Sequence, residues 1–208
     1  MGLTKRKEIK SIDKDERKQK RDFEGLVSQL SNLDPQVRRW AVKDLSEFGH
    51  EASSILSKQL LEEADKSVRE AILTSMLHIA DPTAVETLVQ CLRSENASLR
   101  NEAIEVLKNL PDQVAPLMSN LLHDKDGDVR IFAVNILETL RHPKVEDLLI
   151  EVIEKDPNVN VCATAVELLA EVGTEQSLPA LRRLKDRFPE EPYILFAVDL
   201  ALKRIQGG

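Results

Sequence analysis

Apolar residues recur along the chain with a period of about 31 residues, which predicts a repeat built from helices. The members of one apolar row start at Val37 and follow at intervals of 31, 31, 30 and 32 residues. Further apolar residues stand four and eight positions after each member, and these offsets share one face of an α-helix. A weaker sixth copy starts at Ile194. The row and its two companions are Val37, Val68, Leu99, Val129 and Val161, then Ala41, Ile72, Ala103, Ala133 and Ala165, then Leu45, Met76, Leu107, Leu137 and Leu169.

A second apolar row keeps the same period and predicts a second helix in each repeat. Its members are the last core residues expected in those helices: Leu30, Leu61, Leu92, Leu122, Ile153 and Leu184. Short corners separate the first helix from the second: Gly49–His50, Asp81–Pro82, Pro111–Asp112, His142–Pro143 and Gly173–Thr174. Each repeat is therefore predicted to be a helical hairpin. Because one hairpin cannot cover its own apolar faces, neighbouring hairpins are expected to stack.

Polar residues mark the start of each first helix. A side chain that can accept backbone amide hydrogens stands three positions before each member of the first row, at Asp34, Asp65, Asn96, Asp126 and Asn158. An arginine follows four positions after each of the first four caps, at Arg38, Arg69, Arg100 and Arg130. We expect a ladder of alternating charge rather than phosphate binding, because each guanidinium has an acid nearby. In the fifth repeat Cys162 replaces the arginine, and Asp156–Pro157 offers a competing helix start.

These residues resemble HEAT repeats, especially the short HEAT-like type found in phycobilin lyase subunits and in many bacterial adaptor proteins. The resemblance rests on Asp34-x-x-Val37-Arg38-x-x-Ala41 and its later copies, and it covers roughly residues 22–206. It implies an all-α fold, a right-handed α-solenoid of the armadillo-like or HEAT type, made of stacked two-helix repeats of about 31 residues each. It also implies that the Asp and Arg pairs fix the stacking angle.

Charge is distributed unevenly between the N-terminal segment and the rest of the chain. Residues 1–21 carry nine basic and four acidic side chains, a formal charge of +5, so the remainder carries −12 of the total of −7. We expect a charged arm over residues 1–21 and a single repeat domain over residues 22–206. The arm is either a solvated tail or a segment that docks on an acidic partner, contacts nucleic acid weakly, or folds back on the acidic domain.

The resemblance implies that second helices line the concave side, so their exposed positions are the expected binding surface. A polar side chain stands two positions before each member of the second apolar row. The adjoining positions Leu60, Cys91, Leu121 and Val152 are apolar. One interpretation is a polar strip beside an apolar seam that grips a peptide. The other is that the polar residues are solvated and their neighbours are core. The polar row is Ser28, Gln59, Gln90, Asn120, Glu151 and Arg182.

No catalytic, metal-binding or cofactor motif stands out. Cys91 and Cys162 are 71 residues apart with no His or Cys at metal-ligand spacing from either, and His50, His78, His123 and His142 do not gather on one predicted face. We expect Cys91 to be a small, partly buried apolar residue and Cys162 a partly exposed thiol. The longest apolar run is too short for a membrane span, and a cytoplasmic location is expected because no signal segment follows Met1.

The sequence therefore predicts a non-catalytic interaction module, an adaptor, scaffold or assembly factor that binds a protein or peptide on its second helices. A tetrapyrrole lyase subunit or chaperone is an alternative, drawn from the resemblance. Weak nucleic-acid binding through the basic arm is another, although the acidic repeats and an aromatic content of 3% disfavour it. The sequence leaves the partner and the oligomeric state open.

Overall fold

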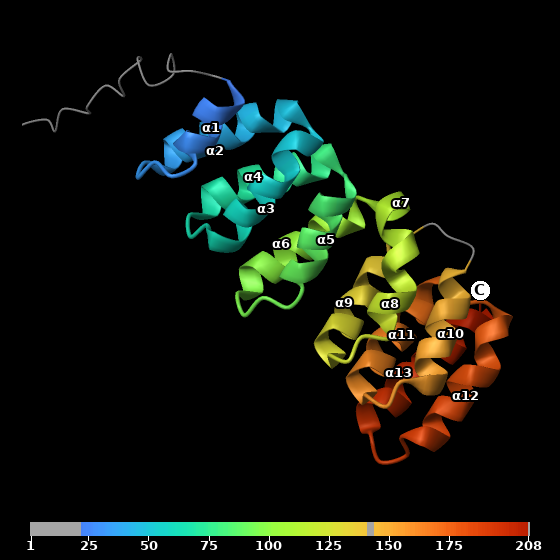
Figure 1. Ribbon diagram of the computed structural model, residues 1–208. Coiled ribbons are helices and arrows are strands. Elements are labelled where there is room, and N and C mark those ends of the chain that lie inside the picture. Colours follow the sequence, from blue (N-terminus) through green and yellow to red (C-terminus); the bar gives the residue numbers. More distant parts are fainter. Residues whose placement is uncertain (1–21, 141–143, 208) are drawn as a thin grey trace, which may run out of the picture. The chain divides into compact units, whose positions relative to one another are not determined.

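The computed structural model describes residues 22–140 and 144–207 (Figure 1). Within these ranges every regular element is a helix, which confirms the all-α prediction. The chain divides into two compact units, Met1–Ile79 and Ala80–Gly208. The predicted arm and the predicted corner at His142–Pro143 lie outside the described residues. None of the described helices is both long and apolar enough to cross a bilayer.

The first unit contains four α-helices between residues 22 and 79. They are α1 (Phe23–Gln29), α2 (Pro35–Leu45), α3 (His50–Glu62) and α4 (Lys66–Ile79), with a 3₁₀ turn, η2 (Ser46–Phe48), after α2. Helices α2 and α4 are the first helices of their repeats, here called first-type helices, and they pack on each other. Helices α1 and α3 are second helices, here called second-type helices, and they pack on α2 and α4 respectively. Gly49 makes the corner between η2 and α3 with a φ of 59°, a left-handed conformation that glycine adopts without the strain a Cβ would cause.

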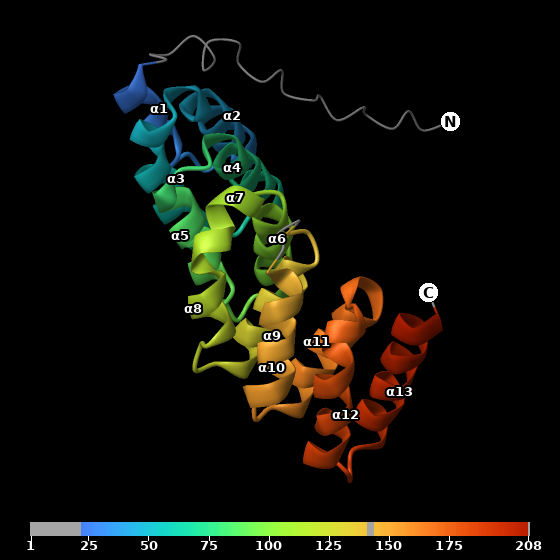
Figure 2. The same ribbon diagram turned by 90° about the vertical axis from the view of Figure 1, so that its right-hand side faces the viewer.

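The second unit continues the same alternation (Figure 2). First-type helices α6, α9, α11 and α13 form one packed layer, in which α9 contacts α6 and α11 contacts both α9 and α13. Second-type helices α5, α8, α10 and α12 pair with them, and α10 also packs on α12. The elements are α5 (Pro82–Cys91), α6 (Ala97–Lys108), α7 (Pro111–Val114), η3 (Ala115–Leu117), α8 (Met118–Leu122), α9 (Gly127–Leu137), α10 (Val145–Lys155), α11 (Val159–Val172), η4 (Glu175–Ser177), α12 (Leu178–Arg187) and α13 (Pro192–Gly207).

The predicted first row and its two companions form the core. All fifteen residues of the three sets are buried, and so is Ile194 of the sixth copy. In the second row Leu61 is an exception, because its side chain is 48% exposed and Leu60 is buried in its place. Two successive leucines fit the helical period almost equally well, so the sequence pattern did not distinguish them.

The second helix of one repeat is interrupted. Residues 111–122 form α7, a 3₁₀ turn and α8 instead of one helix. Pro116 stands in the interruption, inside the 3₁₀ turn. Proline has no amide hydrogen to donate and its ring clashes with the preceding turn of an α-helix, so it breaks a regular helix at this point.

Candidate protein-interaction site

Each first-type helix from α2 to α11 begins at the polar residue the repeat supplies. Asp34, Asp126 and Asn158 each accept the amide hydrogen of the residue two positions later, at 2.8–2.9 Å. Asp65 and Asn96 accept from two amides each. Helix α11 begins after Asn158, so Asp156–Pro157 does not start it. These side chains satisfy amide groups that an isolated helix leaves without partners.

The four repeat arginines share a task that the sequence did not reveal. In each case the guanidinium Nη1 donates to the backbone carbonyl of the residue six positions earlier, in the corner that follows the preceding second-type helix. The accepting carbonyls belong to Asn32, Glu63, Ser94 and Asp124, at 2.8, 3.4, 2.6 and 2.7 Å. Each arginine therefore stands on a first-type helix and satisfies backbone carbonyl groups of the corner that precedes this helix, and Arg69 also donates to the Ala64 carbonyl at 2.8 Å.

The carboxylates bound directly by Arg38 and Arg130 are not the cap residues. Arg38 forms a two-pronged pair with Glu63, at 2.9 and 2.7 Å, and Arg130 forms one with Asp156, at 2.6 and 3.0 Å. Burial alone raises the pKa of Glu63, but hydrogen bonds from Arg38, the Asp65 amide and Gln59 outweigh it and hold that pKa below its ordinary value. The hydrogen bond to Asp156 raises the pKa of Arg130.

The fifth repeat solves the same problem with different residues. Cys162 is fully buried, so the expectation of a partly exposed thiol is wrong. Its Sγ lies 3.4 Å from the Asp156 carbonyl oxygen, and Arg187 of α12 donates to that same oxygen at 2.7 Å and also to the carbonyl of Ile153. The Arg187 guanidinium is a stronger donor than the Cys162 thiol and takes the place of the repeat arginine at this carbonyl.

Neither cysteine is placed for thiol chemistry. Burial raises the pKa of the Cys91 thiol to about 11, and burial likewise raises that of Cys162 to about 11. Within residues 22–140 and 144–207, no group of three or more His, Cys, Asp or Glu side chains is arranged to hold a metal ion.

The predicted polar row lies on the second-type helices, one residue on each. The row residues Ser28, Gln90, Asn120 and Arg182 are exposed, while Gln59 and Glu151 are half-buried. Their apolar neighbours Leu60, Cys91, Leu121 and Val152 are buried. These neighbours are therefore mainly core residues, although Val152 also lines a cavity.

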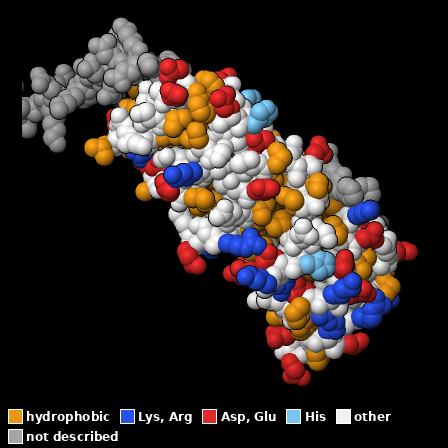
Figure 3. Space-filling view, viewed as in Figure 1, with side chains coloured by type: hydrophobic (Ala, Val, Ile, Leu, Met, Phe, Trp, Pro, Cys, Tyr) orange, Lys and Arg blue, Asp and Glu red, His pale blue; other side chains and the backbone are white. Residues whose placement is uncertain are grey.

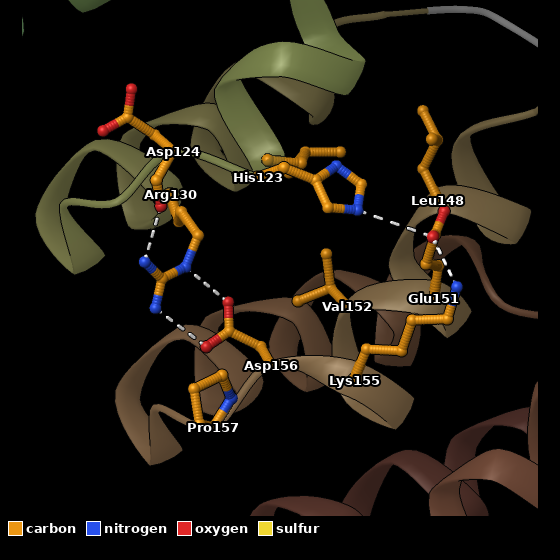
Figure 4. A pocket seen from close by; sticks show the side chains of 10 residues that line it. His123, Asp124, Arg130, Leu148, Glu151, Val152, Lys155, Asp156 and Pro157 are labelled. Carbon is orange, nitrogen blue, oxygen red and sulfur yellow. Dashed lines mark hydrogen bonds and ion pairs between the residues drawn. The ribbon is translucent and has the colours of Figure 1, made fainter.

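One member of the row borders a cavity of about 250 Å³ in the second unit. The end of α8 and the start of α9 form one wall, and α10 forms the other (Figure 4). Val152 supplies apolar surface, as do Leu122 and Leu148, while His123, Glu151 and Lys155 stand at the edge (Figure 4). The cavity thus combines an apolar floor with charged groups at its rim, as is usual for sites that take a side chain of a ligand.

The polar groups at the rim interact with one another. Lys155 Nζ lies 2.8 Å from Glu151 Oε1, and His123 Nε2 lies 3.6 Å from the same oxygen. The hydrogen bond that Lys155 donates to Glu151 lowers the pKa of Glu151, and the same bond raises the pKa of Lys155. The second nitrogen of the ring, His123 Nδ1, lies 2.8 Å from the Ser119 carbonyl oxygen, so this nitrogen carries a proton.

Basic side chains gather on the same part of the second unit. The space-filling view shows Lys and Arg clustered over α10 and α12 (Figure 3). Helix α12 carries Arg182, Arg183, Lys185 and Arg187 against one acid, Asp186. Arg183 pairs with Glu154, and Lys185 pairs with Asp199. Arg182 belongs to the predicted polar row, whereas His123 and Lys155 were not predicted. His123 stands one position after Leu122 of the second apolar row, and Lys155 stands two positions after Ile153 of that row.

Comparison with known proteins identifies the family. The sequence profile of HEAT repeats matches residues 23–108 and 114–192, which make up most of the chain. The chain therefore belongs to the HEAT repeat family, and the predicted resemblance is confirmed.

Two curated relatives and one solved structure illustrate the range of similar proteins. Protein YibA of Escherichia coli (strain K12) is 28% identical over 145 residues, covering 67% of this chain and 50% of that protein, so the chain spans about half the length of this relative. The "Uncharacterized phycocyanin operon protein Z" of Pseudanabaena tenuis (strain PCC 7409) is 23% identical and covers 88% of this chain and 95% of its own. The solved structure is that of an archaeal HEAT-like repeats protein from Thermococcus onnurineus NA1. It is 16% identical with a TM-score of 0.48, and the match covers 88% of this chain and 86% of that protein.

Proposed function

We propose that the chain is a non-catalytic protein-interaction module that binds a segment of a partner protein on its second-type helices. The cavity between α8 and α10 is the centre of this site, and its apolar floor with a charged rim is the observation that carries the proposal. HEAT repeats are a scaffold family, which supports interaction as the general role.

The cavity suits a single apolar side chain of the partner. Leu148 and Val152 would contact that side chain, while Glu151 and Lys155 would exchange their mutual ion pair for contacts with polar groups beside it. An exposed ion pair of this kind contributes little to stability, so its rearrangement costs little. The neighbouring row members Asn120 and Arg182 would then contact the peptide on either side.

Peptide selection on the full chain tests this proposal. A displayed library of random peptides is selected, and the binding of the enriched peptide is measured by fluorescence anisotropy. Leu148→Asp and Glu151→Lys should each weaken binding about tenfold or more. The matched control is Glu105→Lys, which makes the same charge change on α6 away from the cavity. Selected peptides that bind both cavity variants as tightly as the wild type would refute this site.

A tetrapyrrole-handling subunit is a second candidate function. It is favoured by the likeness to phycocyanin operon protein Z, which extends over 88% of this chain. A titration of the full chain with a free bilin, followed by absorbance, separates the two roles. A shifted and intensified visible band supports a bilin-handling role, whereas an unchanged spectrum argues against it.

A further inference from the structure

The last helix, α13, differs from the other first-type helices at one core position. Five residues after the repeat's first anchor, the earlier helices carry a buried apolar side chain, whereas α13 carries Asp199, whose side chain is 62% exposed and bonded to Lys185. A charged residue at this position does not suit the packing of a further repeat against α13. The buried residues at the equivalent positions are Val42, Leu73, Ile104, Val134 and Val166.

Helix α13 nevertheless exposes a stripe of large apolar side chains. Tyr193, Phe196 and Leu200 are 58%, 68% and 40% exposed, and offsets of three and seven residues place them on one side of the helix. They border a cavity of about 290 Å³ between α11 and α13. Single exposed apolar residues are ordinary, but three in a stripe beside a cavity form a patch of the kind that marks interaction sites.

The other wall of this cavity is acidic. Glu167 and Glu171 of α11 line it, and both also line an adjoining cavity of about 180 Å³ between α9 and α11, where Glu138 joins them. The Tyr193 hydroxyl donates to Glu167, which links the acidic wall to the apolar stripe, and this bond raises the pKa of Tyr193. Arg204 is the one basic residue among those lining the two cavities.

We propose that Glu167, Glu171, Tyr193, Phe196 and Leu200, here called the α13 groove, dock a basic segment of a partner protein. The segment would place a large apolar side chain against Phe196 and Leu200, and a neighbouring Lys or Arg against Glu167 and Glu171. Charge complementarity favours this occupant. The carboxylates of Glu167 and Glu171 lie beside the apolar side chains of the groove, so they would repel an acidic ligand and attract a basic one. Asp199 disfavours the alternative in which a second copy continues the repeat.

The α13 groove is separate from the cavity between α8 and α10. It lies on first-type helices and shares no lining residue with that cavity, so the two sites can be tested independently. If Leu148→Asp did not weaken binding of the peptide selected from the library, this result would count against the proposed function and not against the α13 groove.

The experiment uses the full chain and a short fluorescein-labelled peptide in which Lys and Arg alternate with Leu and Phe. One comparison peptide replaces its basic residues by Glu, and another replaces its apolar residues by Ser. Anisotropy titrations should show that only the first peptide binds well. Phe196→Ser and Glu171→Lys should each raise its dissociation constant about tenfold, while Glu105→Lys should leave it unchanged. Phe196 and Glu171 are exposed, and circular dichroism verifies that both variants fold.

Three outcomes would overturn the proposal. The first is equal affinity for the wild type and both groove variants, and the second is equally tight binding of the Glu peptide. The third is evidence for an occupant from the same protein. Sedimentation that shows a dimer lost in Phe196→Ser would assign the groove to a second copy. Tighter groove binding by a peptide of residues 1–21 than by the designed peptide would assign it to the chain's own basic segment.

Discussion

The starts of α9 and α11 show two ways of meeting one structural requirement. At α9, Arg130 stands on the helix itself, caps the Asp124 carbonyl and pairs with Asp156. At α11 the equivalent residue is Cys162, and Arg187 reaches the Asp156 carbonyl from α12. In both places a guanidinium donates to a backbone carbonyl just after a second-type helix, although the two arginines stand at different positions of the repeat.

The largest expected effect concerns the reactivity of Cys162. The rate at which its thiol is labelled distinguishes a buried core residue from an exposed thiol. A thiol with a pKa of about 11 is far less ionised at pH 8 than an ordinary cysteine, so labelling should be about a hundredfold slower from ionisation alone. The labelling rate of Cys162 is measured with Ellman's reagent on the Cys91→Ala variant, both in the native state and in guanidinium chloride. Fast, complete labelling of the native protein would show that Cys162 is accessible and that α11 starts differently from this description.

Loss of Arg130 should destabilise the fold strongly. Its side chain is 12% exposed and that of Asp156 is 5% exposed, so Arg130→Ala leaves a carboxylate buried without its guanidinium partner. We expect a loss of about 3 kcal/mol in the free energy of unfolding, measured by urea denaturation. Arg183→Ala is the control, because the Arg183–Glu154 pair is largely exposed and should contribute less than about 1 kcal/mol. Equal effects would remove the distinction between the two pairs.

Arg187→Ala should have a smaller effect, because it removes donors to two carbonyls but leaves no buried charge without a partner. We expect a loss of about 1.5 kcal/mol. The sharper test adds Cys162→Arg to this variant. If the arginine position is interchangeable, the second substitution should recover part of the loss by donating to the Asp156 carbonyl, as Arg130 does to Asp124. A double variant less stable than Arg187→Ala would indicate that the buried site at Cys162 has no room for the larger side chain.

These features differ in how far the sequence could predict them. The two helix types and the burial of Val37 or Val68 follow from helical periodicity, which depends on residues a few positions apart, whereas the family was suggested by the resemblance of the repeated motif at Asp34 to HEAT repeats. The burial of Cys162 was predicted wrongly because its compensating partner, Arg187, stands 25 residues later on another helix. The cavity beside Glu151 was missed for a related reason, since three helices contribute to it and His123 carries no local signal. The binding role of the polar row stays a prediction.

The smallest expected effect is the pH dependence of the Arg38–Glu63 pair, which has no counterpart at Cys162. The pKa of Glu63 is lower in the folded chain than its ordinary value of about 4.3, so the folded protein binds this proton less readily than the unfolded chain. The contribution of Glu63 is therefore fully present above that ordinary value and is lost as the pH falls through the folded pKa. Urea denaturation of wild type and Glu63→Gln at pH 7 and at successively lower pH should show a stability difference that narrows below about pH 4.3. A difference independent of pH would show that the hydrogen-bonding geometry of Glu63, and not its charge, is what Arg38 requires.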